Sequence, residues 1–214
     1  MTCRLLFVIQ SYPSARSANV LCDTRILWQL RDTRNYDLHV LCMRHPGQPL
    51  EEKVDGLTVH RIPMGWLFER NSRVLSQGDS AYKRAIILAE RLQMRMRQVS
   101  HIADYPYTDL KAVRLFVQAA EELYQSIGFD LVAAEHYGLE TLNAGLTLKE
   151  NHPEIKYVQF FWDSMSGGFR PKYLPGSYID KRRFALEKKG LFGGFCGRDS
   201  GIGPAQRAKT TIWN

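Results

Sequence analysis

The feature that most constrains this sequence is an uninterrupted apolar run near its start, residues 5–9 (Leu-Leu-Phe-Val-Ile). A strand with one face in water alternates apolar and polar residues, so an unbroken run predicts a strand buried on both faces of a parallel sheet. A Ser-rich segment over residues 10–19 then predicts a loop, with Ser17 as the N-cap of a following helix. That helix carries an apolar stripe formed by Val20, Thr24, Leu27 and Leu30. Residues 37–42 return as a second strand.

The rest of the chain repeats this alternation of strands and helices. An Asp55-Gly56 turn leads into a strand over residues 57–62, which Pro63 ends. The later elements expected are helices over 82–99, 110–127, 139–152 and 177–189, and strands over 130–135 and 157–161. Asp109 precedes the second of these helices and Gly128 is placed as its C-cap. Such alternation predicts a doubly wound, Rossmann-like α/β domain with a mostly parallel sheet.

Ligands of such sheets bind in the crevice outside the carboxyl ends of the strands. Three segments that follow predicted strands are therefore the candidate functional loops: residues 10–19, 135–138 and 162–168. Beyond Gly190 the sequence is rich in Gly and has no helical or strand periodicity. We therefore expect one domain over residues 1–190 and an irregular Gly-rich tail over residues 191–214.

Composition is that of an ordinary soluble globular protein. The 214 residues suffice for one substantial core, with 44% hydrophobic and 24% charged residues. No apolar run approaches the roughly 20 residues of a membrane-spanning helix, and Arg4 interrupts the apolar start too early for a standard secretory signal. These features predict a cytoplasmic protein.

Charge and cysteine usage narrow the classes of partner. The net charge of +7 predicts an anionic partner: nucleotide-sugar phosphates, a phospholipid surface or nucleic acid. No zinc-finger, RNP or KH signature is present, which argues against nucleic acid. The loop over residues 10–19 contains no glycine, which argues against a dinucleotide or flavin cofactor. The widely spaced cysteines predict packed free thiols and no metal site; they are Cys3, Cys22, Cys42 and Cys196.

Four segments, in chain order, carry a family resemblance. Residues 4–13 form a strand and a loop that ends in Pro13, and residues 55–63 have the sequence Asp-Gly-Leu-Thr-Val-His-Arg-Ile-Pro. Residues 130–132 are Asp-Leu-Val, and residues 182–189 end in Glu-Lys-Lys. These segments resemble the "FVS-x-x-x-P", "DGV-x-V-x-R-x-P", "D-V-V-H-x-H" and "x-x-E-K" segments in the N-terminal domain of GT-B glycosyltransferases, especially the large retaining family 4.

The resemblance implies the acceptor-side half of a hexosyltransferase. Such an enzyme transfers a hexose from a nucleotide-sugar, its substrate, to a glycan or lipid-linked acceptor and needs no further cofactor. In this family a C-terminal domain with a Glu-x(7)-Glu motif binds the donor, and these 214 residues lack it. We therefore expect a truncated chain with little or no activity alone. A non-catalytic acceptor- or partner-binding module of the same fold is the alternative.

Catalytic candidates lie at two strand ends. Glu135 and His136 could bond sugar hydroxyls, although the family carries histidines where this chain has Ala133 and Glu135. The alternative is a pair that caps the following helix. Asp163 could orient an acceptor hydroxyl, or form an N-cap or Asx turn.

Substrate-binding candidates occupy the first and third loops. They are Ser14, Arg16, Ser17, Asn19, Trp162, Gly167 and Gly168. In the first loop, hydroxyl, amide and guanidinium groups suit donor phosphates, and a capped helix start is the alternative. Trp162 could be a sugar platform or a core residue, and the two glycines a hinge or a turn.

A basic helix over residues 82–98 is a candidate membrane-surface element. Its cations include Lys83, Arg84, Arg91 and Arg95. They flank an apolar stripe, as in helices that lie on anionic lipid. The alternative is a solvated face over the core.

Overall fold

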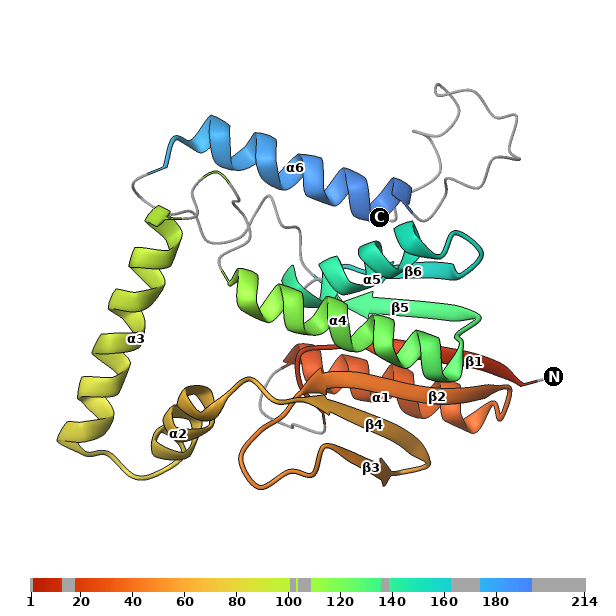
Figure 1. Cartoon of the computed structure of the whole chain (residues 1–214), viewed down its shortest axis with the longest axis horizontal. Coiled ribbons are helices and arrows are strands. Elements are labelled where there is room, and N and C mark those ends of the chain that lie inside the picture. Colours follow the sequence, from red (N-terminus) through yellow and green to blue (C-terminus); the bar gives the residue numbers. More distant parts are fainter. Residues whose placement is uncertain are drawn as a thin grey trace.

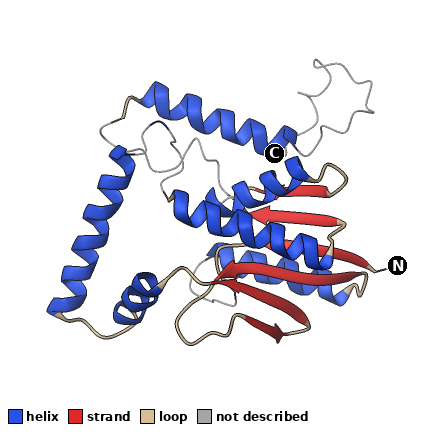
Figure 2. Ribbon diagram, viewed as in Figure 1, coloured by secondary structure: helices blue, strands red, loops and turns tan. Residues whose placement is uncertain are grey.

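A computed structural model describes residues 2–12, 18–100, 103, 109–135, 139–162 and 174–193. Over these residues a central sheet is covered by helices on both faces (Figure 1, Figure 2). The strands are β1 (Cys3–Val8), β2 (Tyr36–Met43), β3 (Glu51–Val54), β4 (Leu57–Ile62), β5 (Leu131–Glu135) and β6 (Lys156–Phe160). Their order is β3-β4-β2-β1-β5-β6, with β3 antiparallel to β4 and the other pairs parallel. The predicted Rossmann-like α/β fold is confirmed.

The helices divide into those that cover the sheet and those that extend beyond it. They are α1 (Ala18–Asp32), α2 (Trp66–Leu75), α3 (Ala81–Ser100), α4 (Leu110–Ile127), α5 (Leu139–Asn151) and α6 (Gly176–Gly193). α1 packs on one face, and α4 and α5 pack together on the other. α6 contacts α5, whereas α3 stands away from the sheet beside α2 (Figure 1).

The two faces of β1 explain its unbroken apolar run. Leu5 and Phe7 pack toward α1, and Leu6 and Val8 pack toward α4 and α5. All four side chains are buried. Both faces of this central strand are thus dry, as the sequence predicted.

Local signals fix the boundaries of two elements. Asp55 and Gly56 both have positive φ, 53° and 80°, which is the geometry of a tight hairpin turn between β3 and β4. The Asp109 side chain accepts a hydrogen bond from the Ala112 amide and caps α4, while Gly128 ends it with a φ of 70°. Both predicted helix ends are confirmed.

Some predictions were wrong at the level of single elements. Asn19 lies in the first turn of α1 rather than in a loop, and α6 continues to Gly193, so the first three residues of the expected tail are helical. Residues 194–214 lie outside the described part. Cys3, Cys22 and Cys42 are free thiols as expected, but Cys22 is exposed rather than packed.

Two elements were not predicted. β3 has the sequence Glu-Glu-Lys-Val, which contains no alternation of apolar and polar residues. No such alternation is needed, because none of its residues is buried. α2 also buries none of its residues, and its apolar side chains therefore follow no core-facing stripe.

Gly145 allows α5 to lie close to the sheet. A Cβ atom at this position would lie 2.7 Å from Cε2 of Tyr157 in β6 and 2.8 Å from Cβ of Ala134 in β5. Both neighbours are themselves buried, so neither has free space to move into.

We predict that Gly145→Ala lowers the free energy of unfolding by roughly 1–3 kcal/mol, because overpacking outweighs the better helix propensity of Ala. Urea denaturation followed by circular dichroism measures this change. Gly78→Ala is the matched control, since a Cβ there meets nothing within 4 Å. Equal stability of the two variants would contradict the packing argument.

Candidate functional site

The carboxyl ends of β1, β5 and β6 meet at one edge of the sheet. The strands are parallel neighbours, with Val8 beside Ala134 and Glu135 beside Phe160. The three predicted functional loops begin at Gln10, Glu135 and Trp162. The hydrogen bonds described next hold these three residues at this edge.

A buried pair of carboxyl groups lies at this edge. Asp23 of α1 is 0% exposed and Glu135 of β5 is 1% exposed, and each carboxyl group acts on the pKa of the other. The other oxygen of Glu135, Oε1, accepts from the Gln10 amide at 3.1 Å. Asp23 Oδ1 accepts from the indole Nε1–H of Trp162 at 3.0 Å. The pair therefore joins α1, β5 and the segments that follow β1 and β6.

The pair holds a proton at neutral pH. Burial raises the pKa of Glu135 to about 9, and the hydrogen bond and charge of Asp23 act in the same direction. Burial also raises the pKa of Asp23. Asp23 Oδ2 and Glu135 Oε2 are buried and accept no hydrogen bond from the described residues, which leaves room for a proton between the two groups. Two buried carboxyl groups in contact cannot both ionise, so one proton is shared between them.

This geometry changes the role expected of Glu135. We predicted direct contact with sugar hydroxyls, but the buried side chain is engaged by Asp23 and by the Gln10 amide. Its backbone oxygen also accepts from the Thr141 hydroxyl at 2.6 Å. The structure therefore favours Glu135 as a residue that positions Gln10, where the loop after β1 begins, and Thr141 of α5.

Asp23 was missed in the sequence although a signal for it exists. It lies on the buried side of α1 between Val20 and Leu27, where its neighbours are apolar. A carboxylate on an apolar stripe needs a partner, and that requirement marks such a residue as a candidate.

The other predicted site residues fall into two groups. Trp162 is half-buried and its ring stacks on that of Phe160, with 6.3 Å between the centroids. Asn19 is placed by its backbone in α1. The candidates that lie outside the described residues are Ser14, Arg16, Ser17, His136, Asp163, Gly167 and Gly168.

A cavity of about 530 Å³ lies between α2, α3 and the N-terminal parts of α4 and α5, and Gln10 lines it. Its polar lining includes Gln10, Asn71, Gln93, Arg97, Lys111 and Glu140. Gln10 Nε2 donates to Glu140 Oε1 at 3.2 Å. Gln10 therefore bonds to Glu135 through its backbone amide and to Glu140, which lines the cavity, through its side chain. Burial raises the pKa of Glu140. The sequence did not predict this cavity, because α2 was not recognised.

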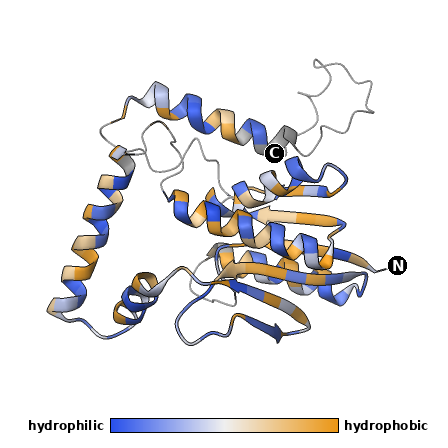
Figure 3. Cartoon of the chain, viewed as in Figure 1, coloured by the Kyte–Doolittle hydropathy of each residue, from blue (hydrophilic) through white to orange (hydrophobic). Residues whose placement is uncertain are grey.

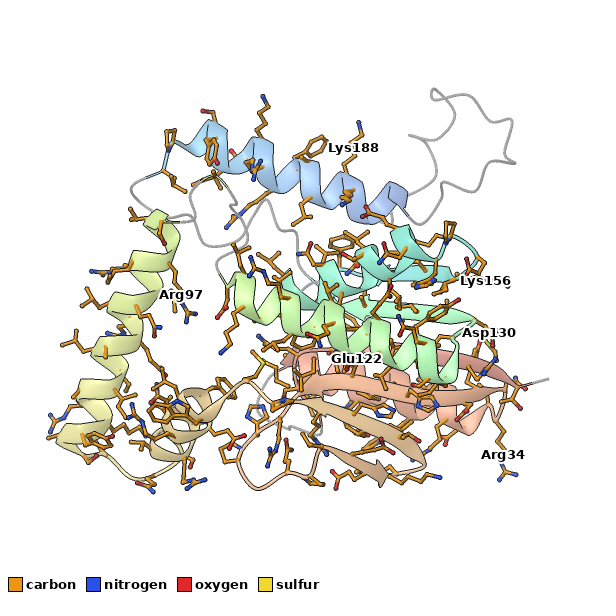
Figure 4. All side chains as sticks on the ribbon, in the orientation of Figure 1. Arg34, Arg97, Glu122, Asp130, Lys156 and Lys188 are labelled. Carbon is orange, nitrogen blue, oxygen red and sulfur yellow. The ribbon has the colours of Figure 1, made fainter. Side chains whose placement is uncertain are left out.

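Polar contacts hold the outer wall of the cavity. Arg97 points from α3 toward the start of α4, where its guanidinium pairs with Asp109 (Figure 4). Asn71 of α2 donates to Glu90 of α3 at 2.9 Å. These contacts hold α2 to α3, and α3 to the start of α4.

The shared proton predicts a pH dependence of stability. Between the ordinary glutamate pKa of 4.5 and about 9, the folded protein binds a proton that the unfolded chain has lost. The free energy of unfolding therefore falls as pH rises, by up to about 1.4 kcal/mol per pH unit. Glu135→Gln keeps a donor toward Asp23 and an acceptor for the Gln10 amide, so it should flatten this slope between pH 6 and pH 8.

Urea denaturation at a series of pH values measures both slopes. Asp79→Asn, which removes an exposed carboxylate, is the control and should retain the wild-type slope. An unchanged slope in Glu135→Gln would show that the pair does not share a proton.

Searches for a metal site, for a membrane-spanning helix and for related proteins gave negative findings. Among the described residues, no group of three or more His, Cys, Asp or Glu side chains is placed to hold a metal ion. No helix in the described part is long and apolar enough to cross a membrane. No protein-family model matches the sequence, and no curated protein matches it. Function must therefore be argued from the residues and their geometry.

Proposed function

We propose that this chain is the acceptor-side domain of a GT-B type glycosyltransferase, a hexosyltransferase that works together with a donor-binding domain. The observation that carries the proposal is the cavity at the carboxyl edge of a Rossmann-like sheet, next to Gln10 and Glu140. This is the edge where such sheets bind ligands. The resemblance of four sequence segments to this family supports the same function.

The cavity lining suits a sugar. Arg97, Lys111 and Gln10 offer donors, and Glu140 and Glu90 offer acceptors. A hexose presents hydroxyls that need both kinds of partner. A mixed polar lining therefore favours a polyhydroxyl ligand over a purely anionic one.

In the proposed reaction, the acceptor hydroxyl oxygen bonds to the anomeric carbon while the bond to the nucleotide diphosphate breaks. The electron pair of that bond leaves with the diphosphate, and a base takes the hydroxyl proton. This chain contributes acceptor positioning, which is the main catalytic effect available to one half of such an enzyme. His136 and Asp163 stay predicted partners of the hydroxyl.

We predict that methyl hexopyranosides bind in the cavity and that Lys111→Ala weakens this binding by about tenfold or more, since a hydrogen bond from a charged donor contributes about 1.5–3 kcal/mol. Saturation-transfer NMR with the methyl glycosides of glucose, galactose and mannose measures it. Lys53→Ala, an exposed lysine on β3, is the matched control. Absence of binding by every glycoside would contradict acceptor binding.

Turnover separates the enzyme from a non-catalytic binding module. UDP-, GDP- and dTDP-hexoses are offered to the chain alone and to the chain fused to a GT-B donor-binding domain. Transfer by the fusion supports the enzyme. Glycoside binding without transfer in either form supports the module.

We also propose that the outward face of α3 contacts an anionic membrane surface. Leu88, Leu92, Met96 and Val99 lie on one stripe of this helix and are 58–69% exposed. Apolar and polar residues alternate along α3 where it stands away from the sheet (Figure 3). These apolar side chains therefore do not cover the core.

Charge on the same helix favours anionic lipid. Arg84, Arg91 and Arg95 are exposed and follow helical spacing beside the apolar stripe. The acidic Glu90 faces α2, where it accepts from Asn71. Lys83, predicted to join the cations, instead donates its ammonium to the Gln77 carbonyl at 2.9 Å and lies off this row. Cations beside an exposed apolar stripe suit a phospholipid surface.

We predict that replacing the three arginines with glutamine (R84Q/R91Q/R95Q) reduces binding to phosphatidylglycerol–phosphatidylcholine vesicles by about 100-fold. The reason is that each arginine contributes roughly 1 kcal/mol to the attraction to anionic lipid. Vesicle sedimentation at low ionic strength measures the partition. The control R25Q/R34Q/R114Q removes the same charge from exposed arginines elsewhere. Equal losses in both variants would reduce the effect to net charge and contradict docking through α3.

A further inference from the structure

We propose that His39 and His60 form an acid-sensitive joint, which holds the β3–β4 hairpin on the sheet at neutral pH and lets it detach in mild acid. The two histidines lie on the neighbouring strands β2 and β4, and the hairpin forms one edge of the sheet (Figure 1). This property is independent of the proposed acceptor function, because neither histidine lines the cavity that carries that proposal.

A chain of four titratable side chains crosses the three strands at this edge. His39 Nδ1 and His60 Nε2 are 3.0 Å apart at its centre. At one end, His39 Nε2 lies 3.5 Å from Oδ2 of Asp37 on β2. At the other end, His60 Nδ1 lies 3.2 Å from Oε2 of Glu51 on β3. The two imidazoles are only 10% and 11% exposed, and the ring of Phe129 packs edge-on against His39.

The contact between the two rings has room for one hydrogen. Two nitrogens 3.0 Å apart form a hydrogen bond when one of them carries a hydrogen and the other accepts it. The four ring nitrogens can therefore carry three hydrogens in this geometry, one between the rings and one facing each carboxylate. Two neutral imidazoles already carry two hydrogens, so the pair can bind one proton and has no place for a second.

The first proton has a defined place in the folded protein. In the neutral pair, one outer nitrogen faces its carboxylate without a hydrogen. His39 Nε2 fits this description, because it is buried and has no hydrogen-bond partner among the described residues. A proton on this nitrogen would give the Asp37 carboxylate a donor and complete the chain.

The charged groups around the pair do not make room for a second proton. Those on the elements packed around it are Asp37, Glu51, Lys53, Arg61, Arg4 of β1 and Glu122 of α4. Glu122 and His60 line a cavity of about 450 Å³ between α4 and β4, which gives solvent protons a path to the pair. Arg61 is paired with Glu52. The carboxylates favour the first proton, but they leave the spacing of the two rings unchanged.

Detachment of β4 from β2 removes the limit of one proton. Once His39 and His60 separate, each imidazole can bind its own proton near the ordinary histidine pKa of 6.5. In the folded protein, burial lowers the pKa of His60, an effect that Glu51 opposes and His39 strengthens. Below pH 6.5 the detached hairpin therefore binds about one proton more than the attached hairpin. Because protons bind preferentially to the detached form, a fall in pH favours detachment.

The number of protons bound by the wild-type pair is the first test. Long-range proton–nitrogen NMR of the histidine side chains follows the protonation of each imidazole between pH 8 and pH 5. We expect the pair to take up one proton in total while β2 and β4 stay paired. Uptake of two protons with unchanged β2 and β4 amide signals would overturn the inference.

Amide hydrogen exchange measures detachment strand by strand. We expect the protection factors of the β4 amides that bond to β2 to fall about fivefold or more from pH 6 to pH 5. A difference of one bound proton changes the opening equilibrium by about tenfold per pH unit. The amides of β5 should not show this fall, which distinguishes detachment of the hairpin from unfolding of the whole domain. Constant protection of β4, or an equal fall in β5, would contradict the joint.

His60→Gln removes one imidazole and keeps an amide group that can reach His39, so it should reduce the change in β4 protection to less than twofold. His152→Gln is the matched control. His152 also lies beside a carboxylate, 3.1 Å from Glu121, but its ring packs on Tyr124 rather than on a second imidazole. This control should keep the wild-type fall. A full fall in His60→Gln, or its loss in His152→Gln, would reject the assignment to this pair. The wild-type proton count decides the matter if His60→Gln does not fold.

Discussion

The proton shared by Asp23 and Glu135 is the interaction on which the functional edge of this sheet depends. Without it, two negative charges would face each other where neither is in contact with water. With it, one carboxyl oxygen remains free to hold the backbone after β1 and another to hold the indole after β6. The sheet brings the strand ends together, and the carboxyl pair fixes the segments that leave them.

Prediction from sequence worked where a pattern has one physical cause. An unbroken apolar run identified β1, because only burial on both faces tolerates it, and Asp109 and Gly128 marked α4 through local hydrogen bonding and backbone geometry. It failed for β3 and α2, which bury none of their residues. The periodic spacing of apolar residues reflects which side chains face a core. Elements that extend beyond the core therefore do not show this spacing.

The candidate site shows the same limit in another form. Topology alone indicated that Gln10, Glu135 and Trp162 would meet, since parallel strands end at a common edge. The partner of Glu135 could not be found in this way, because Asp23 comes from a helix on one face of the sheet and is brought there by packing. The cavity required in addition the position of α2 and α3, which only the structure supplies.

Asp109 has two tasks that respond differently to the surrounding solution. One carboxyl oxygen caps α4 through the Ala112 amide, and the other pairs with Arg97 of α3. The cap is a short hydrogen-bonding contact within one helix, whereas the pair joins two partly exposed charges and is screened by dissolved ions. Ionic strength therefore acts selectively here: concentrated salt loosens the hold of α3 on the cavity while the first turn of α4 stays intact.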